Sequence, residues 1–264
     1  MPPTDNSTGT RSLKTVSKAA EVLETIKSHG GISVTELSRA LDIPKSSAYT
    51  QLKTLSENGF VVKQDDEYVL ALKFISFGEY VRNQHALYRH GKPHIDELAR
   101  ETEQYAHLVT EENGRGLNLY RSRGDTSVGG DYQNRKLQQP DYLHYTAAGK
   151  AILASLPDER VHEIIDQHGL PERTDNTITD SETLFKELAA IRERGYAYND
   201  EEEIRGFRAI GTPIRGGDSK VLGSLSISGP TSYFSDERFD QALPEQVIES
   251  ANIIEVNITM SGQD

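Results

Sequence analysis

The sequence predicts an α+β protein of two domains, a small winged helix-turn-helix followed by a larger α/β domain of the kind that senses ligands. Three helical patterns within the first 60 residues are followed by two β-rich runs, and from residue 104 onward strand patterns alternate with helical ones. The length of 264 residues also favours two domains, because one domain typically takes roughly 100 to 200 residues.

Cysteine usage and hydropathy limit where the protein works. The chain contains no cysteine, which excludes disulfides and thiolate zinc sites and is typical of a reducing compartment. No apolar run approaches the roughly 20 residues of a membrane helix, and the polar beginning MPPTDNSTGTRS lacks the apolar core of a signal peptide. We therefore expect a soluble cytoplasmic protein without a membrane partner, whose residues 1–12 form a disordered tail.

The net charge of -12 argues against a nucleic-acid partner until its distribution along the chain is considered. Residues 1–55 carry seven basic and five acidic side chains, a net charge of +2, so the acidic excess lies downstream. An acidic surface with few lysines also suits a cytoplasm with molar salt, where charges are screened within roughly 3 Å. A haloarchaeal source is our interpretation of this composition.

The first elements form a helix-turn-helix in this prediction. Apolar residues at helical spacing predict a helix over 16–27, which the Gly-Gly pair at 30–31 stops. Ser33 or Thr35 can cap a second, short helix, and a tight turn at 42–44 leads into a third.

The third helix separates an apolar stripe from a polar face. Ala48, Leu52 and Leu55 repeat at helical spacing and are expected to point inward. The opposite face can then lie in a DNA major groove, where short polar and basic side chains reach phosphates and base edges. An ordinary helical hairpin with a solvated polar face is the alternative, and the β-hairpin that follows makes it less favoured. The expected DNA-contacting residues are Thr35, Lys45, Ser46, Ser47, Tyr49, Thr50, Lys53 and Lys63.

The remaining elements define the domain bounds. Two β-rich runs, FVVKQ and EYVLAL, are joined by a turn at 65–66, which predicts a wing and closes the first domain at 13–73. Residues 74–90 are expected to form a connecting helix, and Pro93 to open the next one. The second domain then covers 91–262, where strand patterns such as GYAYND and FRAIGTPIR lie between helical segments.

Two motifs point to a bound metal or nucleotide but lack the residues to hold one. His90 and His94 have the i, i+4 spacing of a chelating pair, with His85 nearby, yet Gly91 and Pro93 interrupt the helical face that they would share. The stretch GTPIRGGD resembles a phosphate loop, but the Lys-Ser/Thr that should follow its glycines is absent. We expect no metal and no cofactor.

A catalytic interpretation of the last strands is also disfavoured. Ser226 and Ser228 share one face of a strand, but no nucleophile elbow surrounds them and no histidine or acid partner is placed by the sequence. Two hydroxyls that line a ligand pocket are the better interpretation. The acidic run 199–203 is expected to leave its glutamates solvated, although its first members could turn inward.

These segments together resemble the IclR-type transcriptional regulators from about residue 11 to 260. The stretch SVTELSRALDIPKSSAYTQLKTLSENGFV resembles that family's winged helix-turn-helix. YLHYTAAGKAILASLP resembles its effector-domain turn and helix, and RGFRAIGTPIR and VLGSLSISGP resemble its final pocket strands. The resemblance implies a DNA-binding domain joined by a helix to a GAF-like domain that holds a small organic effector. It also implies homodimers or homotetramers on a palindromic double-stranded DNA operator.

The resemblance also implies an effector site. Carried over by position, the backbone at Ala148 and Gly149 would receive the effector's carboxylate or hydroxyls, and Ser226 and Ser228 would hydrogen-bond it.

The chain departs from the family pattern at several of these positions. Asn199 stands where members that bind small keto acids have an aspartate, and Ala209 where many have a cysteine, so the pocket is less acidic and roomier at one wall. The loop at 134–142 reads NRKLQQPDY where a shorter Arg-Pro-Leu turn is usual. Thr50 replaces a common arginine and so removes a contact worth roughly 1 to 3 kcal/mol to a base.

We therefore expect a ligand-responsive transcription factor that controls a catabolic operon. Tyr132, Tyr142 and Tyr145 near the variable loop favour a sugar, a sugar acid or an aromatic acid as effector, because tyrosine offers a stacking face and a hydroxyl. The alternative is a small-molecule enzyme with a fused winged-helix interaction domain. A protein–protein module whose winged helix does not touch DNA is a third hypothesis.

Overall fold

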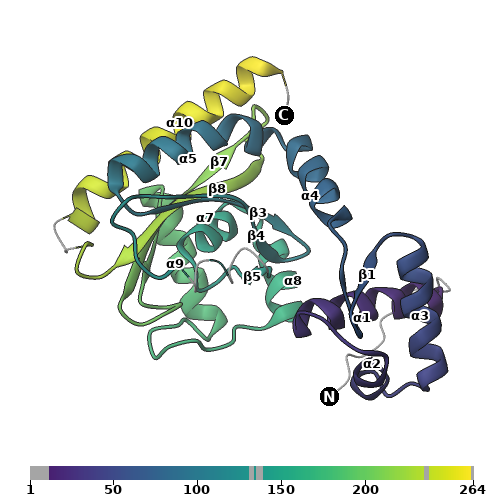
Figure 1. The fold of residues 1–264 in the computed structure, drawn as a ribbon. Coiled ribbons are helices and arrows are strands. Elements are labelled where there is room, and N and C mark those ends of the chain that lie inside the picture. Colours follow the sequence, from purple (N-terminus) through teal and green to yellow (C-terminus); the bar gives the residue numbers. More distant parts are fainter. Residues whose placement is uncertain (1–11, 131–133, 135–138, 235–237, 263–264) are drawn as a thin grey trace. The chain divides into compact units, whose positions relative to one another are not determined.

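The computed structural model describes residues 12–130, 134, 139–234 and 238–262, and it divides into two compact units between Val81 and Arg82. Each unit is described by itself (Figure 1). The disordered tail expected at 1–12 lies almost entirely outside the described residues.

The first unit is a three-helix bundle with a β-hairpin, the winged helix-turn-helix that the sequence predicts. A single apolar core joins all five elements, and it includes Ile26 of the first helix, Leu37 of the second and Leu52 of the third. The two strands pair antiparallel. The elements are α1 (Lys14–His29), α2 (Val34–Ala40), α3 (Lys45–Glu57), β1 (Val61–Gln64) and β2 (Glu67–Leu70).

Local signals set the helix ends of this unit. The α1 helix stops at Gly30, whose φ of 74° lies in the left-handed region that glycine adopts without strain. The cap of α2 is Ser33 and not Thr35, which lies within the helix. The Ser33 hydroxyl accepts a hydrogen bond from the Glu36 amide, and the Glu36 carboxylate accepts one from the Ser33 amide at 2.9 Å. This reciprocal capping box fixes the turn that positions α2 before α3.

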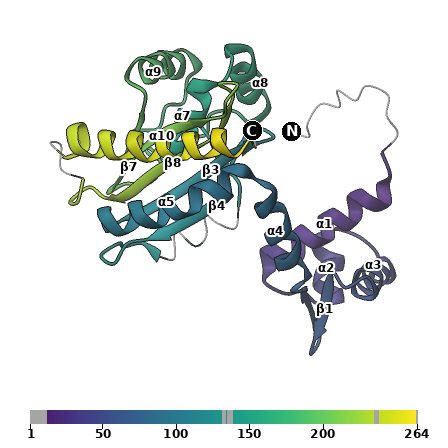
Figure 2. The same cartoon turned by 90° about the horizontal axis from the view of Figure 1, so that it is seen from above.

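The second unit is built on a six-stranded antiparallel sheet in the order β5-β4-β3-β8-β7-β6. Helices α5 and α10 cover one face, and α7, α8 and α9 lie on the other (Figure 2). The strands are β3 (Tyr105–Glu112), β4 (Arg115–Arg123), β5 (Asp141–Tyr142), β6 (Ala197–Asp200), β7 (Phe207–Arg215) and β8 (Val221–Pro230). The helices are α5 (Ala86–Thr102), α7 (Ala147–Ser155), α8 (Asp158–His168), α9 (Ser181–Arg194) and α10 (Leu243–Ser261).

The connection between the units corrects two expected helix bounds. The single helix expected over 74–90 is broken at His85, where α4 (Lys73–Gln84) gives way to α5. Pro93, expected to open a helix, lies inside α5. A proline at this position removes one helical hydrogen bond, but the buried apolar face of α5, with Ile95 and Leu98 against the sheet, keeps the helix continuous.

A buried ion pair joins α7 to the loop that follows β6. The Lys150 ammonium contacts the Glu202 carboxylate, and these side chains are only 2% and 9% exposed. The loop is fixed further because the Glu202 amide donates to the Asn199 side chain at 2.8 Å and its carbonyl accepts from the Thr177 hydroxyl at 2.6 Å. Burial raises the pKa of Glu202 above its usual value, and Lys150 opposes this shift.

The ion pair leads to a first prediction. Replacing Lys150→Met leaves the Glu202 carboxylate buried without its counterion, and we expect the free energy of unfolding to fall by about 3 to 5 kcal/mol. Adding Glu202→Leu removes the stranded charge and should recover most of this loss. Urea denaturation followed by circular dichroism measures both values, and equal losses in the single and the double variant would contradict the role of the pair.

A second prediction concerns the start of α7. A methyl group added at Gly149 would lie 2.2 Å from the Leu143 carbonyl oxygen, which is backbone and cannot swing away. Gly149→Ala should therefore destabilise the protein by about 1 to 3 kcal/mol in the same denaturation assay. Gly78→Ala in α4 is the control, because nothing lies within 4 Å of the added methyl, and it should be neutral or stabilise by up to about 1 kcal/mol.

Candidate DNA-binding surface and ligand cavity

The α3 helix has the two faces that the sequence predicts. Ala48, Leu52 and Leu55 are its buried residues. Tyr49, on the opposite face, is 51% exposed. The exposed residues of this face are Lys45, Ser46, Ser47, Tyr49, Thr50 and Lys53.

Neighbouring contacts hold some of these polar groups. The Thr50 hydroxyl donates to the Ser46 carbonyl at 2.9 Å, so it is turned back along the helix. The Lys53 ammonium lies 3.7 Å from a Glu57 carboxylate oxygen. Lys63 is exposed on β1, whereas Thr35 is half-buried in α2. The structure therefore brings seven of the eight expected residues to exposed positions of α3 and the wing, and Thr35 is the one that is partly covered.

The second unit has a small cavity between the sheet and the first turn of α7, lined by both polar and apolar residues. Its volume is about 30 Å³. Four of the six expected effector residues line it, and Gly149 and Asn199 do not. The expected residues in its lining are Ala148, Ala209, Ser226 and Ser228, and the others are His107, Val109, Gly116, Asn118, Asp141, Thr146, Ala147 and Glu203.

The first turn of α7 borders this cavity. Thr146 caps the helix, and its hydroxyl accepts a hydrogen bond from the Gly149 amide at 2.9 Å. Of the two amides expected to receive the effector, that of Gly149 already has this partner. Ala147 and Ala148 of the same turn line the cavity, where the positive end of the helix dipole favours an anion or a carbonyl oxygen.

Asn199 does not line the cavity but contacts a residue that does. Its buried side chain accepts from the Glu202 amide, and its amide nitrogen lies 3.5 Å from the Glu203 carboxylate, which lines the cavity. The expectation that the glutamates of this run are solvated is wrong for Glu202 and Glu203, which are both buried. The partner of Glu202 is Lys150, 52 positions earlier in the chain, so no local pattern in the sequence indicates this contact.

The strands contribute side chains that the sequence reasoning missed. The His107 imidazole lies 3.0 Å from the Ser228 hydroxyl, and His107 pairs in register with Ser226. A bulge in the β3–β4 pairing places Leu119 between two register segments, so that Asn118 faces the cavity and Tyr120 faces α5. The alternation of side chains along the strand could have predicted that His107 faces the cavity. The bulge leaves no such pattern in the sequence, so Asn118 could not have been predicted in this way.

Aromatic side chains surround the β5 edge of the cavity. Tyr145 donates a hydrogen bond to the Asp141 carboxylate, and burial together with that carboxylate raises the pKa of Tyr145, which stays protonated. The Arg115 guanidinium stacks 3.6 Å from the Tyr142 ring centroid. Tyr132 and most of the variable loop lie outside the described residues.

Other kinds of site find no support in the described part of the chain. No group of three or more histidine, aspartate or glutamate side chains there could hold a metal ion. His94 instead lies 3.1 Å from the Asn257 side-chain amide. None of the described helices combines the length and the apolar character needed to cross a membrane.

Comparison with known proteins agrees with this arrangement. The sequence profile of the IclR helix-turn-helix domain matches residues 15–65, and that of the bacterial transcriptional regulator IclR C-terminal domain matches 79–256. The probable HTH-type transcriptional regulator ArcR of Halobacterium salinarum is 41% identical over 250 residues, which cover 94% of this chain and 95% of that protein.

Solved structures share the fold. The Thermotoga maritima IclR structure is 30% identical, covers 93% of this chain and 98% of its own, and superposes with a TM-score of 0.73. An IclR homologue from Microbacterium hydrocarbonoxydans, solved with 4-hydroxybenzoate, is 21% identical, covers 92% and 98%, and has a TM-score of 0.78.

The relatives are transcriptional regulators by name, so the alternative of an enzyme with a fused winged helix does not hold. The chain belongs to the IclR family of transcriptional regulators, and it carries that family's helix-turn-helix DNA-binding domain.

Proposed function

We propose that this protein controls a catabolic operon by binding a palindromic operator, and that a small organic effector in the second unit regulates this binding. The observation that carries the proposal is a cavity with several polar lining residues at the start of α7, in a chain whose α3 exposes a polar face. We assign residues 13–73 to DNA binding, 74–90 to the connection and 91–262, as a GAF-like domain, to the effector.

A second copy of the chain is the proposed partner of the first unit. This unit exposes apolar side chains in or next to α1 and α4, and exposed apolar surface is typical of protein interfaces. A palindromic operator requires such a two-fold symmetric pair of DNA-binding units. We propose a homodimer, or a homotetramer made of two dimers, in a haloarchaeal cytoplasm. The exposed side chains are Leu13, Val16, Leu72, Ile75, Phe77, Tyr80 and Val81.

We propose that the effector is a sugar, a sugar acid or an aromatic acid. Its acidic or carbonyl end would meet the first turn of α7 and the hydroxyls of Ser226 and Ser228, while His107, Asn118 and the carboxylates offer polar partners for the rest. The Microbacterium homologue holds 4-hydroxybenzoate, a molecule within this range.

The size of the cavity supports regulation by effector binding. A volume of about 30 Å³ holds one or two water molecules and is far below the roughly 300 to 1,000 Å³ of ordinary ligand sites. We therefore propose that an effector binds a wider form of the second unit. A ligand shifts the equilibrium between two forms by its differential affinity for them. An effector that binds only the wider form therefore stabilises that form, and α4 and α5 can couple the change to the DNA-binding unit.

A third prediction tests DNA binding itself. Purified protein mixed with fragmented genomic DNA in roughly molar KCl should retain a palindromic site, and sequencing the retained fragments identifies it. The double variant Tyr49→Ala and Lys53→Ala should lose this retention, because both side chains belong to the exposed face of α3. Lys186→Ala on the exposed surface of α9 is the charge control. Unchanged retention by the double variant would remove α3 from the DNA-binding surface.

A fourth prediction tests the effector site. Calorimetry with 4-hydroxybenzoate and with D-gluconate should show binding of one of them, and the same compound should change the affinity for the retained DNA site. Ser226→Ala should weaken compound binding by roughly 5- to 20-fold, the effect of one lost hydrogen bond, and leave the DNA affinity without compound unchanged. An equal loss of DNA affinity in this variant would contradict the proposed separation of the two sites.

A further inference from the structure

The elements with which a winged helix contacts DNA carry more acidic than basic side chains in this protein. All charged side chains of α3 and of the β1–β2 hairpin, the wing, are exposed, and their net charge is -1. A basic surface is the usual electrostatic footprint of a DNA-binding protein, so this balance must affect how the complex responds to salt. The bases are Lys45, Lys53 and Lys63, and the acids are Glu57, Asp65, Asp66 and Glu67.

The wing is fixed to α3, so its tip approaches DNA together with the helix. The Phe60 amide donates to the Leu55 carbonyl at 2.9 Å, which binds the base of the wing to the last turns of α3. The Lys73 ammonium donates to the Asn58 carbonyl at 3.0 Å and lies 4.3 Å from the Phe60 ring centroid, and this closes the same corner.

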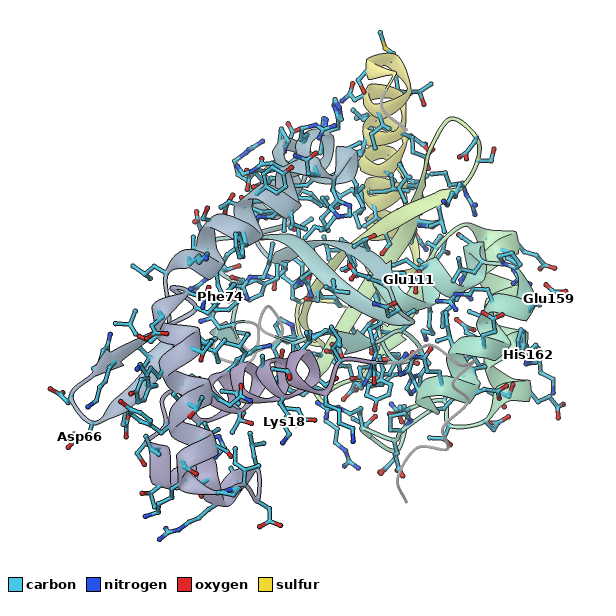
Figure 3. All side chains as sticks on the ribbon, turned by 90° about the vertical axis from the view of Figure 1, so that its right-hand side faces the viewer. Lys18, Asp66, Phe74, Glu111, Glu159 and His162 are labelled. Atoms are coloured by element: carbon cyan, nitrogen blue, oxygen red, sulfur yellow. The ribbon has the colours of Figure 1, made fainter. Side chains whose placement is uncertain are left out.

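Acidic side chains occupy the tip of this wing. Gln64 and Glu67 form the last pair of the hairpin, and Asp65 and Asp66 make the turn between them, with Asp65 in the left-handed region at a φ of 52°. Figure 3 shows Asp66 at the end of the hairpin, where it projects into solvent. Lys63 is the single basic side chain of the wing, one residue before Gln64.

The basic side chains of α3 are few and partly balanced. Lys53 lies 3.7 Å from the Glu57 carboxylate, which reduces the positive field that it offers to a phosphate. The exposed side chains between the lysines are neutral, namely Ser46, Ser47, Tyr49 and Thr50. Contacts to DNA by this helix therefore depend more on hydroxyl groups than on charge.

We propose that the acidic wing tip, Asp65 and Asp66, sets the ionic-strength dependence of DNA binding. A lysine that contacts a phosphate releases a condensed cation, and each such contact makes log K fall with log salt by a slope of about -0.9. A carboxylate brought close to the phosphates acts in the opposite sense, because cations must accumulate between the two negative groups. The two effects offset each other on this surface, so the complex keeps its affinity at salt concentrations that dissociate a complex made by a basic wing.

This inference rests on the proposed operator binding, and the test separates the two. Fluorescence anisotropy measures the dissociation constant from about 0.1 to about 1 M KCl with two duplexes, one that carries the selected genomic site and one of random sequence. Three phosphate contacts alone would give a slope of about -2.7 for each protomer, and we expect the wild-type slope to be shallower.

The variant Asp65→Asn and Asp66→Asn removes both tip charges, and asparagine tolerates the left-handed conformation at position 65. We expect it to bind more tightly at low salt and to steepen the slope by roughly one to two units. Glu21→Gln and Glu24→Gln on α1 change the charge of the same unit equally, away from the wing, and should leave the slope unchanged.

Each other outcome overturns the inference. A wild-type slope of about -2.7 or steeper for each protomer, or an unchanged slope in the wing variant, shows that the tip does not approach the phosphates. Equal steepening in the wing and α1 variants shows that net charge is responsible and not the tip. Failure to bind either duplex at any salt concentration contradicts the proposed operator binding itself, which is a different result from a wrong slope.

Discussion

The antiparallel pairing of β3 with β8 is the contact on which the second unit depends. More than 100 residues separate the two strands, yet they lie at the centre of the sheet and meet along five residue pairs, from Tyr105–Ser228 to Val109–Ser224. The two strands lie especially close where β3 passes Gly223 of β8, because a methyl group added there would lie 2.2 Å from the Val109 carbonyl oxygen. This register turns His107 and Ser226 toward α7, and Leu108 and Leu225 toward α5 and α10. The cavity and the apolar core beneath α5 and α10 thus lie on opposite faces of these two paired strands.

A buried ion pair holds the loop that forms one side of the cavity. The Lys150–Glu202 pair connects α7 with the loop after β6, and Asn199 orients that loop so that Glu203 reaches the cavity. A desolvated pair stabilises little by itself, but the loss of either partner leaves an expensive charge behind. The pair therefore holds the loop against α7. A cavity with such a rigid wall can respond to a ligand by a shift between two defined forms, which regulation at a distance requires.

The elements expected to contact DNA share the acidic character of the whole chain. The chain as a whole has a net charge of -12, and even α3 with the wing has a small acidic excess. Binding to a polyanion then cannot depend mainly on phosphate charge. Neutral side chains on a precisely oriented helix must contribute more, and their hydrogen bonds are much less sensitive to salt than ion pairs are. Rigid attachment of the wing to α3 therefore matters more here than in a strongly basic domain.

The sequence by itself determined the elements whose signals are local. The capping serine before α2, the apolar stripe of Ala48, Leu52 and Leu55, and the turn at 65–66 act over a few residues, so they predicted the winged helix-turn-helix. Ser226 and Ser228 were placed at a pocket because they alternate along a strand, and the resemblance to a known family added Ala148 and Ala209.

Only the tertiary structure decided which distant residues meet. His107, Asn118 and Glu203 reach the cavity through a strand pairing, a bulge and a buried ion pair, and of these only the strand around His107 leaves a periodic pattern in the sequence. Pro93 stayed inside α5 because burial of the helix face outweighs its local preference. Local chemistry determines the elements, whereas long-range packing determines the partners of each buried polar group, because that choice depends on the free energy of the whole fold.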